Sequence, residues 1–337
     1  MTKNGCLRLG LGLFIIALIV AGVLGFAAWH YLFSPYKGYS DEAFVEIPHG
    51  ANTRQLADKL ENAGVIRTRY SLLLWRALHP RAPLQAGEYQ FDSPLLPGDV
   101  FNKIRRGATY YEVLTVPEGS NIFEIAQLLK GLRYGHPDEF LAAAKDPLLI
   151  KDLDPAAPTL EGYLFPASYR VARKTTAAEL CRMMVEQFRR HWRELTATVA
   201  DADTHRVVTI ASLVEKETAA PPERPLIASV FVNRLSRNMP LQCDPTVVYA
   251  ALRANDYRGT IYRSDLANKD PYNTYVHPGL PPGPIANPGL ASLKAALHPA
   301  QSDYLYFVAK PGMVGQHTFS ATLNEHELAV KAYRHHE

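Results

Sequence analysis

The clearest pattern in the chain is a continuous run of 21 uncharged, mostly apolar residues from Leu9 to Trp29. A helix of about 20 apolar residues spans the hydrocarbon core of a bilayer, so this run predicts a transmembrane helix. A cleavable signal peptide is the alternative, but its apolar region is usually only about 7–15 residues long. Lys3 and Arg8 precede the run, and positive charge on that side favours a cytoplasmic N-terminus. We therefore expect everything after the run to lie outside the cytoplasm.

Two later stretches, residues 47–60 and residues 116–129, share one pattern and form an internal repeat. Each copy predicts a strand, then a turn with Pro or Gly, then an amphipathic helix that begins at a polar N-cap. A further strand is expected over residues 87–91 and a short helix over residues 99–104. These elements predict a small α+β domain over residues 43–135.

The rest of the chain alternates helical periodicity with loops that are rich in Pro and Gly. Thr176 and Glu179 have the spacing of a capping box, which predicts the start of a helix. A second helix, over residues 207–218, should end before Pro221 and Pro222 because proline lacks the N–H that a helix needs. The last expected elements are a strand over residues 304–308 and a closing helix over residues 324–333.

The predicted fold class is therefore α+β, with a single N-terminal transmembrane helix, a small α+β module and a C-terminal α+β domain. In chain order, the expected segments are a cytoplasmic N-terminus (1–8), a transmembrane helix (9–29), a linker (30–42), the small domain (43–135) and the C-terminal domain (136–337).

Two carboxylates near the end of the predicted helix over residues 207–218 are candidates for chemistry. Burial disfavours the charged form of a carboxyl group and raises its pKa, which suits a general acid. Glu215 and Glu217 flank the apolar stripe on opposite sides, so periodicity does not choose between them. Both could equally be solvated surface charges. The stripe itself consists of Val207, Ala211, Val214 and Thr218.

Composition excludes several classes of function. The hydrophobic fraction of 47% indicates folded domains, and 36 Lys and Arg against 33 Asp and Glu give too mild a charge for a nucleic-acid partner. The chain has no H-E-x-x-H, C-x-x-C or G-x-S-x-G pattern, so we expect no metal, no cofactor and no serine nucleophile. Cys181 and Cys243 would share an oxidising compartment and could pair, or could be two separate small apolar side chains.

A series of motifs follows in order along the C-terminal part of the chain: 161–166 (EGYLFP), 215–218 (EKET), 241–249 (LQCDPTVVY), 272–275 (YNTY), 279–289 (GLPPGPIANPG) and 317–320 (HTFS). This order resembles the YceG-like endolytic murein transglycosylases. The resemblance is looser in the N-terminal part, where residues 43–135 would form a LysM-like module that binds glycan; a plain spacer domain is the alternative.

The resemblance assigns the catalytic role to Glu217, the second Glu of the E-K-E triplet. Glu217-Thr218 is also similar to the Glu-Ser pair of other lytic transglycosylases. The resemblance to the family implies cleavage of the bond between N-acetylmuramic acid and N-acetylglucosamine in nascent peptidoglycan. The implied product is a 1,6-anhydro end, and its formation would terminate strand growth. It also implies a bacterial inner (plasma) membrane enzyme with a periplasmic catalytic domain. The expected partners are glycan strands, membrane lipid and peptidoglycan polymerases of the penicillin-binding class.

Polar residues in the matched motifs are candidate contacts to the sugar or to the catalytic carboxyl: Gln242, Asp244, Thr246, Asn273 and Tyr275. Asp244 has an alternative role, because Asp before Pro245 is a common way to cap the start of a helix. Cys243 departs from the family pattern, in which a small hydroxyl residue is common at this position.

Two other functions stay open. One is a hydrolase of the same bond in which Glu217 and Asp244 act together, as paired carboxylates do in ordinary glycosidases. The other is a non-catalytic, membrane-tethered scaffold of the wall-synthesis machinery, which an anchor and a repeat domain would serve equally well.

Overall fold

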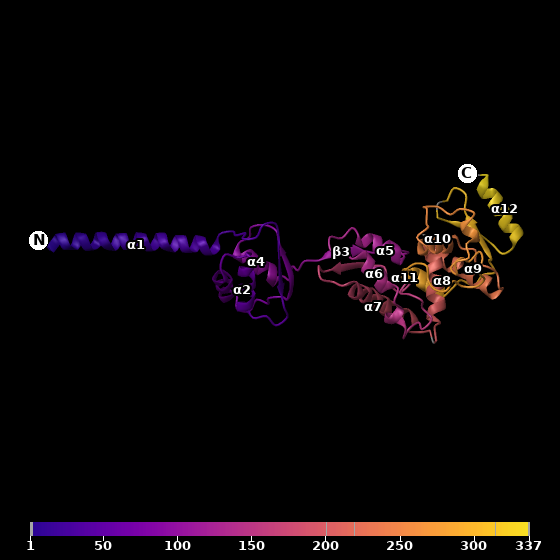
Figure 1. The fold of residues 1–337 in the computed structure, drawn as a ribbon, viewed down its shortest axis with the longest axis horizontal. Coiled ribbons are helices and arrows are strands. Elements are labelled where there is room, and N and C mark those ends of the chain that lie inside the picture. The colour runs from indigo at the N-terminus through magenta and orange to yellow at the C-terminus, as the bar shows by residue number, and fades with distance from the viewer. Residues whose placement is uncertain (1–2, 200, 219, 314, 336–337) are drawn as a thin grey trace. The chain divides into compact units, whose positions relative to one another are not determined.

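The structure is a computed structural model that describes residues 3–335 except 200, 219 and 314. It consists of two compact units, Met1–Tyr111 and Glu112–Glu337, which are described separately below (Figure 1). The described residues form helices and three small antiparallel sheets of two strands each. This confirms the predicted mixture of helices and small sheets with one apolar N-terminal helix.

The first unit begins with a single long helix, α1 (Lys3–Phe33). Its stretch from Leu11 to Phe33 is, among the described residues, the one helix long and apolar enough to cross a membrane. The helix continues beyond the predicted end at residue 29 because the next residues, His30 to Phe33, include no Pro or Gly that would stop it.

The rest of the first unit is a two-stranded sheet covered by three helices. Strand β1 (Ala43–Ile47) pairs antiparallel with β2 (Gly87–Phe91), and helices α2 (Thr53–Asn62), α3 (Arg69–Leu78) and α4 (Pro97–Arg105) pack with it. The core consists of apolar side chains from all five elements, including Val45, Leu56, Leu60, Leu72, Tyr89, Phe91 and Phe101. The first repeat copy therefore has its predicted form of strand, turn and helix.

The second unit begins earlier than the sequence predicted, at residue 112 instead of 136. The reason is pairing between strands that are far apart in the chain, because β3 (Glu112–Thr115) pairs with β4 (Ser168–Val171). The helix of the second repeat copy, α5 (Ile122–Leu129), packs against α6 (Pro137–Ala144). The two repeat copies therefore belong to different units.

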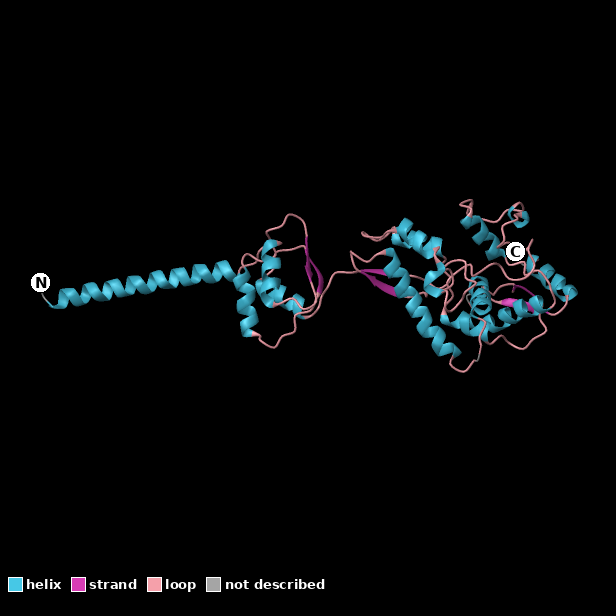
Figure 2. Cartoon of the chain, turned by 60° about the horizontal axis from the view of Figure 1, so that its bottom comes forward, coloured by secondary structure: helices cyan, strands magenta, loops and turns pink. Residues whose placement is uncertain are grey.

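The remaining elements of the second unit enclose a central helix, α8 (Thr204–Glu217), most of whose residues are buried. Helices α9 (Arg224–Ser236), α10 (Asp244–Arg253) and α11 (Leu290–Leu297) contact α8. The long helix α7 (Ala177–Thr196) starts at the predicted capping box. The chain ends in the hairpin β5 (Tyr306–Ala309) and β6 (His317–Ser320) and in α12 (Leu323–Arg334), which packs on that hairpin (Figure 2). Three short 3-10 helices complete the unit: η1 (Pro147–Ile150), η2 (Pro221–Glu223) and η3 (Asp265–Ala267).

The two cysteines of the second unit do not pair. Cys181 is buried in the core on α7, and Cys243 is buried at the start of α10, and both thiols are free. Of the two alternatives for these cysteines, a disulfide or two separate thiols, the structure has the separate thiols.

Candidate active site

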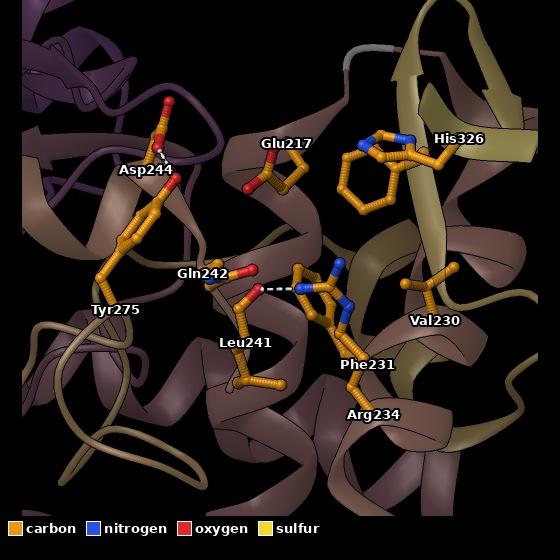
Figure 3. Close-up of a pocket in the computed structure, with 10 residues that line it drawn as sticks. Glu217, Val230, Phe231, Arg234, Leu241, Gln242, Asp244, Tyr275 and His326 are labelled. Carbon is orange, nitrogen blue, oxygen red and sulfur yellow. Dashed lines mark hydrogen bonds between the residues drawn. The ribbon is translucent and has the colours of Figure 1, made fainter. Parts of the chain in front are cut away.

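A cavity of about 290 Å³ lies where α8 ends, and Glu217 is part of its wall (Figure 3). Its lining comes from α8, α9, α10, the loops around 241 and 275, the terminal hairpin and α12: Glu217, Val230, Phe231, Arg234, Leu241, Gln242, Asp244, Tyr275, Phe307 and His326. In Figure 3 the Glu217 carboxyl lies between the Asp244–Tyr275 pair on one side and His326 on the other.

Glu217 is the last residue of α8, and Thr218 leaves the helix in an extended conformation. Burial raises the pKa of the Glu217 carboxyl above its ordinary value, and the charge of Asp244 raises it further. The negative end of the α8 dipole acts in the same direction, because it disfavours a carboxylate. A hydrogen bond from Cys243 and the positive charges of His317 and Arg234 lower the pKa in part. The net effect keeps a proton on Glu217 at a pH where an exposed glutamate has lost it.

Cys243 is the direct partner of this carboxyl group. Its Sγ donates to Glu217 Oε1 at 3.0 Å. The preceding residue, Gln242, has a left-handed backbone conformation with φ of 50°. Residues other than Gly rarely adopt this conformation outside functional or constrained sites. Two hydrogen bonds to Thr274 hold this conformation. Gln242 N–H donates to the backbone O of Thr274, and Cys243 N–H donates to its Oγ1. This conformation directs the exposed Gln242 side chain into the cavity and the thiol toward Glu217.

Glu215 has a different and structural environment. Its side chain is only 5% exposed and forms an ion pair at 3.2 Å with Arg224, which is 8% exposed. The other carboxylate oxygen accepts from Gly289 N–H at 2.9 Å. Both oxygens are thus engaged away from the cavity. The choice between the two glutamates, which periodicity left open, follows from these contacts: Glu217 alone of the two faces the cavity.

One of the two roles predicted for Asp244, a cap at the start of α10, is wrong. The helix begins at Asp244 itself, the N-cap residue is Cys243, and no side chain closes the first turn. The Asp244 carboxylate instead accepts from the Tyr275 hydroxyl at 2.5 Å. Burial and this carboxylate raise the pKa of Tyr275, so the phenol keeps its proton and orients Asp244 at the cavity wall.

The other two candidate contacts, Thr246 and Asn273, are fully buried and do not line the cavity. Thr246 Oγ1 donates to Cys243 O and is bonded to Thr274 Oγ1 at 2.9 Å. Asn273 Nδ2 donates to the backbone O of Asn268 at 2.7 Å. The structure therefore does not place these two residues where they were predicted, in direct contact with a sugar. They hold the loops that present Gln242 and Tyr275.

Comparison with known proteins shows the family to which the chain belongs. The model of the YceG-like family matches residues 45–332. This chain belongs to the YceG-like family. The family predicted from the order of the motifs is therefore confirmed.

Two relatives named endolytic murein transglycosylase show how far the likeness extends. The Bacillus subtilis protein is 34% identical over 307 residues, which cover 86% of this chain and 84% of the relative. The Streptococcus pneumoniae protein is 31% identical over 88% of this chain but only 60% of its own length. A crystal structure of a YceG-like protein from Listeria monocytogenes has 33% identity and a TM-score of 0.55, and covers 86% of this chain.

Several motifs of this YceG-like protein meet at one buried amide. Asn287 Oδ1 accepts from Gly162 N–H and Leu164 N–H at 2.8 and 2.9 Å, and Asn287 Nδ2 donates to Ser120 O and to Glu161 Oε1. Burial raises the pKa of Glu161 to about 8. The EGYLFP and NPG motifs are therefore structural: they fix the second repeat copy against the loop that bonds to Glu215.

Two residues of the cavity had no signal in the sequence. Arg234 on α9 donates to the backbone O of Leu305 and Leu241 at 2.6 and 2.9 Å, which holds its guanidinium at the cavity wall. His326 on α12 stacks on Tyr306, and its buried Nδ1 has no hydrogen-bond partner in the described part of the chain. Burial and nearby Arg234 lower the pKa of His326, so the imidazole is neutral near pH 7.

His317 of the HTFS motif is not part of the cavity lining, and Glu223 in η2 holds it. Its N–H and its Nδ1 contact the two carboxylate oxygens of Glu223 at 2.9 and 2.7 Å. This pair links the terminal hairpin to the segment that follows Glu217. In the described part of the chain, no group of three or more His, Cys, Asp and Glu side chains is placed to hold a metal ion.

Proposed function

We propose that this protein is a peptidoglycan lytic transglycosylase in which Glu217 serves as both general acid and general base. The observation that carries the proposal is the separation of the two glutamates of the EKET motif. Glu215 forms a buried ion pair with Arg224, whereas Glu217 faces the cavity in surroundings that raise its pKa. The names of the relatives in Bacillus and Streptococcus support the same reaction class.

The proposed reaction needs one carboxyl group. The protonated Glu217 donates its proton to the glycosidic oxygen, and the bond from that oxygen to C1 of N-acetylmuramic acid breaks with its electron pair on the oxygen. The resulting carboxylate then takes the proton of the sugar's own 6-hydroxyl, and that oxygen closes onto C1. The proton count balances, Glu217 is regenerated and no water is consumed. The attacking hydroxyl belongs to the same sugar, so its effective concentration is high without a positioned water.

The other cavity residues have supporting roles in this proposal. Gln242 is exposed in the cavity and can exchange hydrogen bonds with a sugar hydroxyl or acetamido group. Asp244, oriented by Tyr275, can accept from a second sugar group and also supports the raised pKa of Glu217. The Arg234 guanidinium supplies positive charge and hydrogen-bond donors at the wall, where it can meet a carbonyl oxygen of the N-acetylmuramic acid acetamido or lactyl amide group.

A muramidase that uses Glu217 with Asp244 is the second candidate, because both carboxyl groups line the same cavity. The two reactions differ in product: hydrolysis leaves a reducing sugar, whereas transglycosylation leaves a 1,6-anhydro end that is lighter by one water. Mass analysis of glycan fragments after treatment with the purified protein separates them. Fragments with only reducing ends would favour the hydrolytic mechanism over the lytic one. The absence of any fragments would favour a non-catalytic scaffold.

We further propose that α1 is retained as an anchor in the inner membrane, with the second unit on the periplasmic side. Lys3 and Arg8 before the apolar run support this orientation. The first unit, with its repeat-like β1–α2 segment, would act as a LysM-like glycan-binding module, and nascent strands from penicillin-binding polymerases would be the substrate. Protease added to spheroplasts should degrade the chain after residue 33; survival of that part would reverse the orientation.

A further inference from the structure

Helix α3 of the first unit is apolar on two faces, and only one of them is covered. Leu72 is buried in the core of the unit. Tyr70, Leu74 and Leu78, spaced four residues apart and so on one side of the helix, are 62%, 44% and 66% exposed. A soluble domain normally places polar residues on the outer stripe of such a helix. The exposed stripe therefore indicates a surface with an apolar partner.

This stripe continues into a groove whose wall includes the membrane anchor. A cavity of about 530 Å³ is lined mainly by apolar side chains of α1, α3 and the start of α4: Trp29, Phe33, Trp75, Leu78, Leu96, Pro97, Gly98, Asp99 and Asn102. Trp29 and Phe33 belong to the last two turns of the helix that can cross a membrane. A residue larger than Gly at 98 would collide with the Trp75 ring, so the groove depends on close packing of α4 on α3.

We propose that this surface, formed by Tyr70, Leu74, Leu78 and the groove beside them, lies in the interfacial layer of the bilayer and is covered by lipid. Lipid is favoured over a protein partner because Trp29 and Phe33 are part of the groove. If α1 crosses the membrane, its outer end lies where acyl chains meet head groups, and the groove is at the same depth.

The charge at the end of α1 agrees with a head-group environment. The Arg67 guanidinium lies over the rings of Tyr31 and Tyr36, with its central carbon 4.9 and 5.1 Å from the ring centroids. Aromatic rings with a basic residue are typical of the belt at the membrane surface, where the cation meets lipid phosphate. The first unit would then rest on the membrane instead of moving freely at the end of a tether, which fixes its height above the bilayer.

In Figures 1 and 2 the end of α1 meets the helical side of the first unit, and its two strands lie on the opposite side. The strand side therefore provides a control position. His49 directly follows β1 in the sequence and is exposed in the turn there. A lipid-facing α3 predicts opposite environments for labels on Leu78 and on His49.

The test uses the full-length protein in nanodiscs of phosphatidylethanolamine and phosphatidylglycerol, with nitroxide labels at Leu74→Cys, Leu78→Cys or, as the control, His49→Cys. Cys6 is replaced by Ser, and the buried Cys181 and Cys243 are left in place. Power saturation compares access by oxygen, which concentrates in lipid, with access by a water-soluble nickel chelate. The ratio of oxygen to nickel access should be several-fold higher at residues 74 and 78 than at residue 49.

Equal ratios at all three positions would overturn the proposal, since they would mean that α3 faces water. Labels on α3 that both reagents fail to reach would also overturn it, in favour of a protein partner or a second copy of the chain. The proposal rests on retention of α1 but not on the proposed activity. The intact mass of the purified protein shows separately whether α1 is retained. Loss of α1 would rule out both the anchor and the lipid-covered surface. A negative result in the glycan assay would count against the proposed activity but not against this surface.

Discussion

The hydrogen bond between Cys243 and Glu217 gives the sharpest prediction about the proposed chemistry. The thiol donates to the carboxyl at 3.0 Å, so it stabilises the charged form of Glu217 and lowers its pKa against the effect of burial. Cys243→Ala removes the donor and should raise the pKa of Glu217. Cys243→Ser, which replaces the thiol by a stronger donor, should lower it.

The size of the effect follows from the strength of the bond. A hydrogen bond to a charged group contributes about 1.5–3 kcal/mol net, and a thiol is a weak donor, so about 1 kcal/mol is a reasonable value for Cys243. Since 1.4 kcal/mol is a factor of about ten, the proton equilibrium of Glu217 should change by a factor of about five in each variant. The two variants should change it in opposite directions.

The assay is the pH dependence of kcat/KM for release of anhydro-ended fragments. The general acid must be protonated in the first step, so activity falls as pH rises through the pKa of Glu217. The alkaline limb should move to higher pH in Cys243→Ala and to lower pH in Cys243→Ser. Cys181→Ala is the matched control, because Cys181 is a buried thiol in the core on α7 that does not line the cavity.

Identical alkaline limbs in the wild type and both Cys243 variants would refute the reasoning. So would a change of the limb in Cys181→Ala of the same size as in Cys243→Ala, because the effect would then follow from loss of stability and not from the contact with Glu217.

Three further predictions concern the surroundings of the site. Glu215→Gln should cost about 3 kcal/mol of unfolding free energy in urea, because it leaves the buried Arg224 charge unpaired, while activity of the folded fraction stays near that of the wild type; a stable but inactive Glu215→Gln protein would contradict this. Asn287→Ala should cost about 3 kcal/mol or more, since it leaves the buried N–H groups of Gly162 and Leu164 without their bond and also removes one bond each from Ser120 O and Glu161 Oε1; a loss below about 1 kcal/mol would show that the amide is not the junction of the motifs. Asp244→Asn should retain far more activity than Glu217→Gln, because Asp244 supports the pKa of Glu217 and need not transfer a proton; equal losses would favour the two-carboxylate hydrolase.

Local patterns predicted several elements of the chain, although α3, α6, β4 and β6 were not predicted. The capping box at Thr176 and Glu179 starts α7 as expected, and α8 ends at Glu217, before Pro221. These features depend on neighbouring residues alone. The boundary between the units was misplaced because it depends on β3 pairing with β4, a contact between distant parts of the chain that periodicity does not contain.

The candidate site could be predicted in part. The family motif pointed to Glu217, and the structure adds the reason why Glu215 does not compete, which is its ion pair with Arg224. Asp244 before Pro245 has the sequence of a helix cap, but the Tyr275 hydroxyl takes its carboxylate instead. Arg234 and His326 were missed because they belong to helices whose own patterns are ordinary, and only the tertiary packing of α9 and α12 brings them to the cavity.

The most direct test of the central claim is the yield of anhydro-ended fragments from polymerised glycan, measured by mass spectrometry for the wild type, Glu217→Gln and Glu215→Gln. Each protein is checked by circular dichroism and assayed at a temperature where it is folded. A general acid–base group contributes about 10²–10⁴-fold, and because the proposed reaction gives no proton-transfer step to Asp244, Glu217→Gln should lose about 1,000-fold or more. Glu215→Gln should lose little. A folded Glu217→Gln protein that releases anhydro-ended fragments at near the wild-type rate would contradict the account.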